Sequence, residues 1–192
     1  GHHAFFLCEN LKIVEIPENS ELKSIGNSAF EYSKIEQILI PPHVVNIGFD
    51  AFAYCSNLRI VKIPKNSELH EIDSNLFTNT KIEKIYIPSH VFKICNNAFS
   101  SCEKLKFIEF DENSELKNIK KFAFSYSNIK QFIIPPRVSN IEIGAFFKCK
   151  DLRIIEISEN SELDLLEKSI FDECNNIFIM IPPSKRDIIN KF

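Results

Sequence analysis

Apolar and polar residues follow one another along this chain in a pattern that returns at fixed intervals. Its unit is an apolar run, L/I-x-x-I-x-I, that stops at proline or another turn-forming residue, as from Leu58 to Pro64. The end of the run alternates apolar and polar residues and is rich in β-branched side chains, which predicts a short β-strand. A second extended piece follows, as from Val44 to Ile47, and then a turn of about one helical cycle that holds an Ala-Phe pair.

The spacing of the Ala-Phe pairs shows how the units are organised. Aligned on this dipeptide, the phenylalanines lie 25 and 22 residues apart in strict alternation, so a long unit and a short unit form a 47-residue repeat. The column consists of Phe5, Phe30, Phe52, Phe77, Phe99, Phe124, Phe146 and Phe171. Periods in this range are typical of leucine-rich-repeat solenoids, in which each coil buries its apolar face only against its neighbours.

The pattern therefore predicts one α/β leucine-rich-repeat solenoid over residues 1–192. We expect a curved, strand-rich stack of eight coils, with a parallel concave sheet, short helical turns and the Phe column along its axis. Residues 1–183 carry the repeats, and residues 184–192 lose the pattern, which indicates a C-terminal cap. Gly1 aligns with Gly26 in mid-coil, so we expect the chain to be part of a longer array. Its full size and its oligomeric state are left open.

Composition and charge narrow the function. Hydrophobic residues make up 44% and charged residues 26%, which is ordinary globular usage. The net charge is −3, with acids and bases interspersed, so binding to nucleic acid by phosphate neutralisation is not expected. No stretch reaches the roughly 18 consecutive apolar residues that a membrane-spanning helix needs.

The cysteines follow the repeat. Five of the six share one column, which is filled in the alternate coils by Ser33, Thr80 and Ser127. These five are Cys8, Cys55, Cys102, Cys149 and Cys174. Members two coils apart lie roughly 10 Å from one another, beyond the ~7 Å limit between the Cα atoms of a disulfide. We expect a small, hydrogen-bonding core position with free thiols; Cys149 and Cys174, in adjacent coils, are the one pair able to meet.

Catalytic and metal-binding patterns are absent from the sequence. His43, His90 and Arg137 share a column but are separated by two coils each, too far apart to hold one ion. No Ser, Cys or carboxylate recurs beside them in a triad-like arrangement, and no Cys-x-x-Cys spacing occurs. The sequence predicts neither an enzyme nor a cofactor or metal site.

The candidate binding residues come from the strand pattern. If the first, fourth and sixth residues of L/I-x-x-I-x-I point inward, the third and fifth face out from the concave sheet. Their apolar members change rows at every coil and make a zigzag stripe, with Lys62 and Lys84 in its polar rim. The stripe consists of Ile13, Leu39, Ile60, Tyr86, Phe107, Ile133 and Ile154. A contiguous apolar patch indicates an interaction site, although cross-strand packing alone could also account for it.

The motifs C-x-x-L-x-x-I-x-I-P, from Cys55 to Pro64, and x-x-I-G-x-x-A-F, from Val45 to Phe52, carry a family resemblance. They resemble the BspA-like, or Treponema pallidum type, leucine-rich repeats, and the alternation of long and short coils is similar to trichomonad surface antigens. The resemblance implies a noncatalytic surface or secreted protein, an adhesin that binds host matrix or a host cell-surface protein. An intracellular leucine-rich-repeat interaction scaffold is the alternative reading, and a cytoplasmic location stays open.

Overall fold

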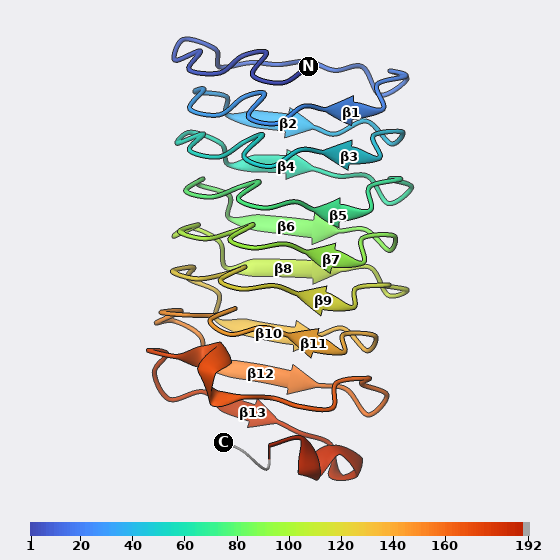
Figure 1. Cartoon of the computed structure of the whole chain (residues 1–192), viewed down its shortest axis with the longest axis vertical. Coiled ribbons are helices and arrows are strands. Elements are labelled where there is room, and N and C mark those ends of the chain that lie inside the picture. The colour runs from blue at the N-terminus through green and yellow to red at the C-terminus, as the bar shows by residue number, and fades with distance from the viewer. Residues whose placement is uncertain (190–192) are drawn as a thin grey trace.

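The structure, a computed structural model, describes residues 1–189 as a stack of similar coils (Figure 1). Each coil contributes up to two short strands. The first row of strands consists of β2 (Gln37–Leu39), β4 (Ile60–Lys62), β6 (Lys84–Ile87), β8 (Phe107–Phe110), β10 (Gln131–Ile134), β12 (Ile154–Ile157) and β13 (Phe178–Met180). The second row consists of β1 (Ser24–Ile25), β3 (Asn46–Ile47), β5 (Glu71–Ile72), β7 (Lys93–Ile94), β9 (Asn118–Ile119) and β11 (Asn140–Ile141).

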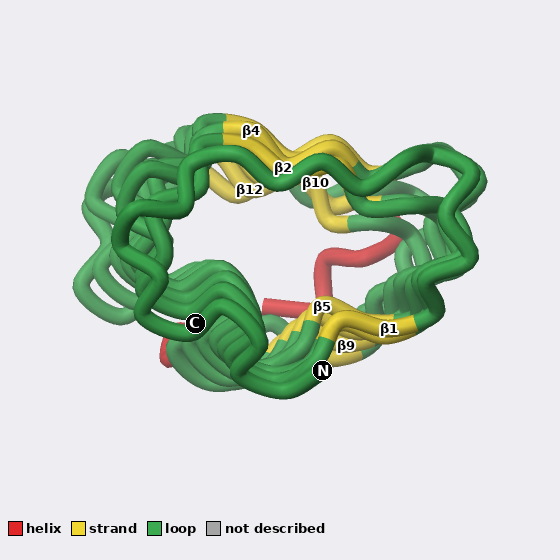
Figure 2. Tube along the Cα trace, turned by 90° about the horizontal axis from the view of Figure 1, so that it is seen from above, coloured by secondary structure: helices red, strands yellow, loops and turns green. Residues whose placement is uncertain are grey.

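The two rows lie on opposite sides of each coil, and the turns close the coil at its two ends (Figure 2). All strand pairs are parallel, with successive coils in register, such as Tyr86 beside Glu109 in β6 and β8. The first row divides into three small sheets, β2–β4, β6–β8 and β10–β12–β13. The second row divides into two, β1–β3 and β5–β7–β9–β11. The parallel solenoid that the 25- and 22-residue spacing predicts is confirmed.

The core between the two rows is built on the Phe column. Each ring stacks on the next at centroid distances from 5.1 to 5.8 Å, so that one continuous ladder runs from Phe5 to Phe171. The rings of Phe52, Phe77 and Phe99 are completely buried. All eight members of the ladder are present, while the first-row strands within residues 1–189 number seven and residues 1–23 contain no strand, so the expected count of eight coils is roughly met.

The turns around the Ala-Phe pairs differ from the short helical turns that we expected. Seven of the eight are hydrogen-bonded turns, whereas the last pair, Ile170-Phe171, lies in the 3₁₀ segment η1 (Lys168–Phe171), as expected. The other helical segment within residues 1–189 is η2 (Pro183–Ile189). The seven turns are not helical because a left-handed residue lies on either side of the pair, such as Asp50 at φ 58° and Tyr54 at φ 58° around Phe52. A left-handed residue reverses the chain direction, so the turn cannot continue as a helix.

The Asn-Ser-Glu insert of each long coil makes the turn after the first-row strand. The sequence pattern placed the insert on the outside, and its Asn and Glu are indeed on the surface. Its serine instead points inward: Ser67 and Ser114 are buried, and each hydroxyl accepts a hydrogen bond from the backbone N–H two residues later. The buried hydroxyl therefore fixes the turn from within.

The last coil is followed by a segment that packs against it. Ile188 of η2 is buried, and its carbonyl accepts a hydrogen bond from the backbone N–H of Leu166 at 3.0 Å. Residues 190–192 of the expected cap lie outside the described residues. Within residues 1–189, no helix has both the length and the apolarity to cross a membrane.

Candidate functional site

The first-row face presents the outward residues of the strands, and their alternation follows the sequence pattern. In β6, Lys84 is exposed, Tyr86 is half-exposed, and Ile85 and Ile87 between and after them are buried. From β2 to β12, the register places the outward apolar residues beside polar ones in the paired strand, as with Phe107 beside Lys84. The apolar residues therefore form the predicted zigzag, one per coil.

All nine residues of the predicted stripe and rim lie on this face. Ile13, Ile60, Phe107 and Ile133 are exposed, with Phe107 leaving 65% of its surface in solvent. Leu39, Tyr86 and Ile154 are half-exposed, and Lys62 and Lys84 are exposed. Their side chains are thus at least partly open to solvent.

The centre of the first-row face is hollowed into a groove of about 410 Å³, within the usual size range of ligand sites. It lies over β4, β6 and β8. It is lined by Arg59, Ile60, Val61, Lys62, Ile63, Lys65, Lys84, Ile85, Tyr86, Phe107 and Glu109. Five of the nine predicted residues therefore meet in one groove, which we call the central groove.

Tyr86 is fixed in this groove by a cross-coil hydrogen bond. Its hydroxyl donates to Oδ2 of Asp111 at 2.6 Å. Burial and the bond to the carboxylate raise the pKa of Tyr86 far above its usual value, and the same bond lowers the pKa of Asp111. Tyr86 therefore stays a neutral donor and Asp111 an anion, and the ring is held as a rigid floor between Ile60 and Phe107.

The first-row face also extends beyond the predicted stripe. Phe178 and Met180 of β13 pair with Ile154 and Glu156 of β12, and both are exposed, Phe178 by 67%. The sequence analysis missed them because the last coil departs from the motif. The signal was the F-I-M-I-P-P run from Phe178 to Pro183, which keeps the strand-exit prolines of the other coils.

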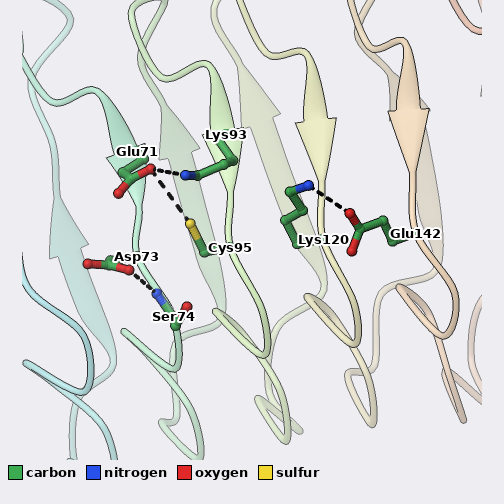
Figure 3. Close-up of polar contacts among 7 residues, drawn as sticks. All are labelled: Glu71, Asp73, Ser74, Lys93, Cys95, Lys120 and Glu142. Carbon is green, nitrogen blue, oxygen red and sulfur yellow. Dashed lines mark hydrogen bonds and ion pairs between the residues drawn. The ribbon is translucent and has the colours of Figure 1, made fainter.

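The second-row face carries a different, polar cluster (Figure 3). Nζ of Lys93 lies 2.5 Å from Oε2 of Glu71, and Nζ of Lys120 lies 2.7 Å from Oε1 of Glu142, so each ion pair joins neighbouring coils. The cluster borders a hollow of about 480 Å³ that Lys121 also lines. The cations on this face are therefore partly neutralised by carboxylates of the adjacent coil.

Three members of this hollow have the donor types of a cation site. The ligand atoms of Glu71, Asp73 and Cys95 lie within 4.8 Å of one another. However, Lys93 already pairs with Glu71, and burial followed by the charge of Glu71 raises the pKa of the Cys95 thiol to about 12. A cation would have to displace the ammonium and ionise the thiol, so we assign the cluster to pairing between coils. Asp73 and Cys95 share one repeat column with Gly48, four residues before the column phenylalanine.

The cysteine column is a small, hydrogen-bonded position of the core, as the Ser and Thr residues in the same column indicated. All six cysteines are free thiols. Cys55 donates to the carbonyl of Phe30 at 3.0 Å and lies 3.4 Å from the hydroxyl of Ser33, and the same two contacts recur at Cys102 and Cys149. The expected hydrogen-bonding core position is confirmed, and the free Cys149 and Cys174 are consistent with it.

The histidine column is paired rather than only solvated. Nδ1 of His43 lies 2.9 Å from Oε1 of Glu68, and Nδ1 of His90 lies 4.0 Å from Oε2 of Glu115. The hydrogen bond from His43 is the main cause of a lowered pKa at Glu68. Each glutamate belongs to the Asn-Ser-Glu insert of the following coil, so this column ties short coils to long ones at the surface.

The stacked coils, the parallel sheet rows and the exposed strand face define the class of protein. The chain is a leucine-rich-repeat solenoid with an exposed first-row strand face.

Comparison with known proteins narrows the class to a family. The BspA type leucine-rich-repeat region matches in six copies, over residues 1–106 and 70–192. The chain therefore belongs to the BspA-type leucine-rich-repeat family. No curated protein sequence matches it.

Solved structures to which the chain is similar include proteins from Bacteroides ovatus, Faecalibacterium prausnitzii and a pneumococcus. A leucine-rich-repeat protein from Bacteroides ovatus is 26% identical with a TM-score of 0.74, over 94% of this chain and 52% of that one. This chain thus spans about half of the B. ovatus protein. A leucine-rich cell surface protein from Faecalibacterium prausnitzii is 19% identical with a TM-score of 0.41, over 98% of this chain and 78% of that one. The pneumococcal vaccine antigen PcpA is 17% identical with a TM-score of 0.41, over 88% of this chain and 63% of that one.

Proposed function

We propose that this chain is a noncatalytic protein-binding module of a surface or secreted protein, an adhesin that attaches to host matrix or to a host cell-surface protein through its first-row face. The observation that carries the proposal is the central groove, where Ile60, Tyr86 and Phe107 meet in a hollow on a face that no other part of residues 1–189 covers. Exposed aromatic residues near the middle of a surface are frequent binding hot spots.

Two further points support this function. Membership of the BspA-type family agrees with the surface role that the sequence resemblance implies. The ionisable lining of the groove consists of four cations, Tyr86 and Glu109, and no hydrogen-bonded pair of nucleophile and base occurs among them. The groove therefore supports recognition and not chemistry.

A solid-phase assay on matrix extract and on intact epithelial cell layers tests the proposal. The double variant Tyr86→Ser and Phe107→Ser should lose attachment while keeping the thermal midpoint of unfolding near that of the wild type, because both side chains face outward. The matched control is Tyr32→Ser with Tyr54→Ser, a pair of exposed aromatic residues at the turn edge. Attachment that survives in a folded Tyr86 and Phe107 variant would remove the binding role from this face.

A second function, that of an intracellular interaction scaffold, is favoured by one observation. All six cysteines are free thiols, which is the usual state in a reducing compartment. Antibody labelling of intact and permeabilised source cells separates the two functions: labelling of intact cells supports the adhesin, and labelling only after permeabilisation supports the scaffold.

A further inference from the structure

The charge around the central groove differs from that of the whole chain. The chain has 23 basic and 26 acidic side chains, a net charge of −3. The lining of the groove has four cations, Arg59, Lys62, Lys65 and Lys84, against the single carboxylate of Glu109, a formal excess of three positive charges. When Asp111 and Glu112, the neighbouring carboxylates that also act on Tyr86, are counted, the excess is one. The groove is therefore a local basic site on an acidic protein.

These cations are also less neutralised than those of the second-row face. There, Lys93 and Lys120 each pair with a glutamate of the adjacent coil. Across residues 1–189, no side-chain hydrogen bond or ion pair holds Arg59, Lys62 or Lys84, and Lys65 only acts at a distance on Asp111. The groove cations can therefore meet the carboxylates of a partner without first breaking internal pairs.

The basic character of the groove does not continue towards the N-terminus along the first-row face. The neighbouring hollow towards the N-terminus, about 230 Å³ over Glu15, Glu18 and Leu39, is bordered by two carboxylates, with Lys62 as its only cation. A long acidic ligand would meet repulsion there. The charge pattern thus favours a short acidic stretch placed over β4, β6 and β8.

The floor of the groove adds an apolar requirement. Phe107 and Ile60 are exposed by 65% and 47%, and the ring of Tyr86 is fixed between them by Asp111. A purely charged ligand would leave this apolar surface uncovered, whereas an aromatic or aliphatic side chain would bury it.

We propose that the central groove binds a short acidic protein segment whose carboxylates pair with Arg59, Lys62, Lys65 and Lys84 while one or more apolar side chains cover Ile60, Tyr86 and Phe107. The inference rests on the proposed function and adds the chemistry of the partner. Complementary charge steers the encounter and apolar contact supplies the affinity. Binding therefore weakens as added salt screens the charges.

Fluorescence anisotropy with labelled synthetic peptides tests this. The probe is a nine-residue peptide of alternating glutamate and leucine; its counterparts carry glutamine in place of glutamate, or serine in place of leucine. We expect binding of the first peptide only, and a loss of affinity of about tenfold or more between 0.05 and 0.5 M salt. Equal binding of the glutamine peptide, or affinity unchanged by salt, overturns the inference.

Charge-reversal variants locate the site. Lys62→Glu with Lys84→Glu should weaken binding of the acidic peptide at least tenfold. The control, Lys117→Glu with Lys121→Glu, makes the same change in net charge at exposed positions outside the groove and should stay within twofold of the wild type. A heparin fragment that binds as well as the peptide and is insensitive to Phe107→Ser would point to anionic polysaccharide and overturn the inference.

The two proposals can fail separately. If Tyr86→Ser with Phe107→Ser abolishes attachment to matrix and cells, but the wild type does not bind the acidic peptide, the adhesin stands and the acidic partner is wrong. If the peptide binds as described while that double variant still attaches, the acidic site stands and adhesion takes place elsewhere.

Discussion

At the scale of single residues, the Phe column holds the coils together. Phe52 is completely buried between the rings of Phe30 and Phe77, at centroid distances of 5.3 and 5.8 Å. Phe5 occupies the same column at the end of the stack, with 43% of its surface exposed. One residue type in one repeat position thus has very different packing, depending on whether a coil lies on both of its sides.

Phe52→Ala should lower the free energy of unfolding by about 3–5 kcal/mol, because it leaves a cavity between coils. Phe5→Ala is the matched control and should cost less than half as much, since its ring is already partly hydrated. Urea unfolding followed by circular dichroism measures both. Equal losses, or an unchanged midpoint for Phe52→Ala, would show that the column does not stabilise the stack.

The thiols should differ in reactivity according to their place in the column. Burial raises the pKa of both Cys55 and Cys102 to about 11, so at pH 8 nearly all of each stays in the unreactive thiol form. Cys8 and Cys174 are half-exposed. Mass spectrometry after brief iodoacetamide treatment at pH 8 should find label at Cys8 and Cys174 first. Early labelling of Cys55 or Cys102 in the folded protein would contradict the assigned burial.

Much of this residue-scale structure could be predicted from the sequence. The eight internal copies can be aligned with one another, and the positions that stay apolar in all of them indicate the buried column. The inward Ile85 and outward Phe107 follow from strand alternation alone. The Glu71–Lys93 pair and the Tyr86–Asp111 bond could not be predicted in the same way. They join residues of different coils through side-chain orientations that no repeat position fixes.

At the scale of elements, the turns depend on backbone conformations that the apolar pattern does not specify. Seven of the eight turns have a left-handed residue two positions before the phenylalanine, and these residues are His3, Ser28, Asp50, Asn75, Asn97, Phe122 and Gly144. Asn, Asp and Gly tolerate this conformation best. Their enrichment before alanine was therefore a readable sign of left-handed turns, whereas we had expected helical ones.

Gly144 is the position where this requirement can be tested. Its φ is +67°, and a Cβ there would lie 2.4 Å from Cε1 of Phe122 in the adjacent coil. Gly144→Ala should therefore destabilise the protein by about 1–3 kcal/mol through strain and overlap. In a Phe122→Ala background the overlap disappears. Gly144→Ala should then destabilise the protein less, because only the strain of an alanine at positive φ remains. An equal cost in both backgrounds, measured by thermal unfolding, would rule out the contact with Phe122.

At the scale of the whole molecule, a stack protected on both sides at its centre should open from its ends. Phe5 of the first coil is exposed by 43%, and Phe6 and Leu7 beside it are exposed as well, whereas the Phe-column rings of the central coils, such as Phe77 and Phe99, are completely buried. The stability of a solenoid is approximately the sum of the intrinsic stability of each coil and the interface energy between adjacent coils. A coil with only one neighbour therefore opens more readily.

Native-state amide exchange should therefore be fastest in residues 1–23 and slowest between Leu58 and Phe146. Mass spectrometry of peptic fragments gives this profile directly. Uniform protection from Phe5 onward would contradict a stack whose stability comes from neighbouring coils.

The central claim for the whole molecule is that a protein partner binds the first-row face at the central groove, and site-specific photo-crosslinking tests it most directly. Benzoylphenylalanine is placed at Phe107, in the groove, or at Tyr54, an exposed aromatic position on the turn edge, and each protein is irradiated on matrix extract or epithelial cell layers. We predict crosslinked partner from position 107 and little from position 54. Crosslinks of equal yield at both positions, or from position 54 alone, would contradict the claim.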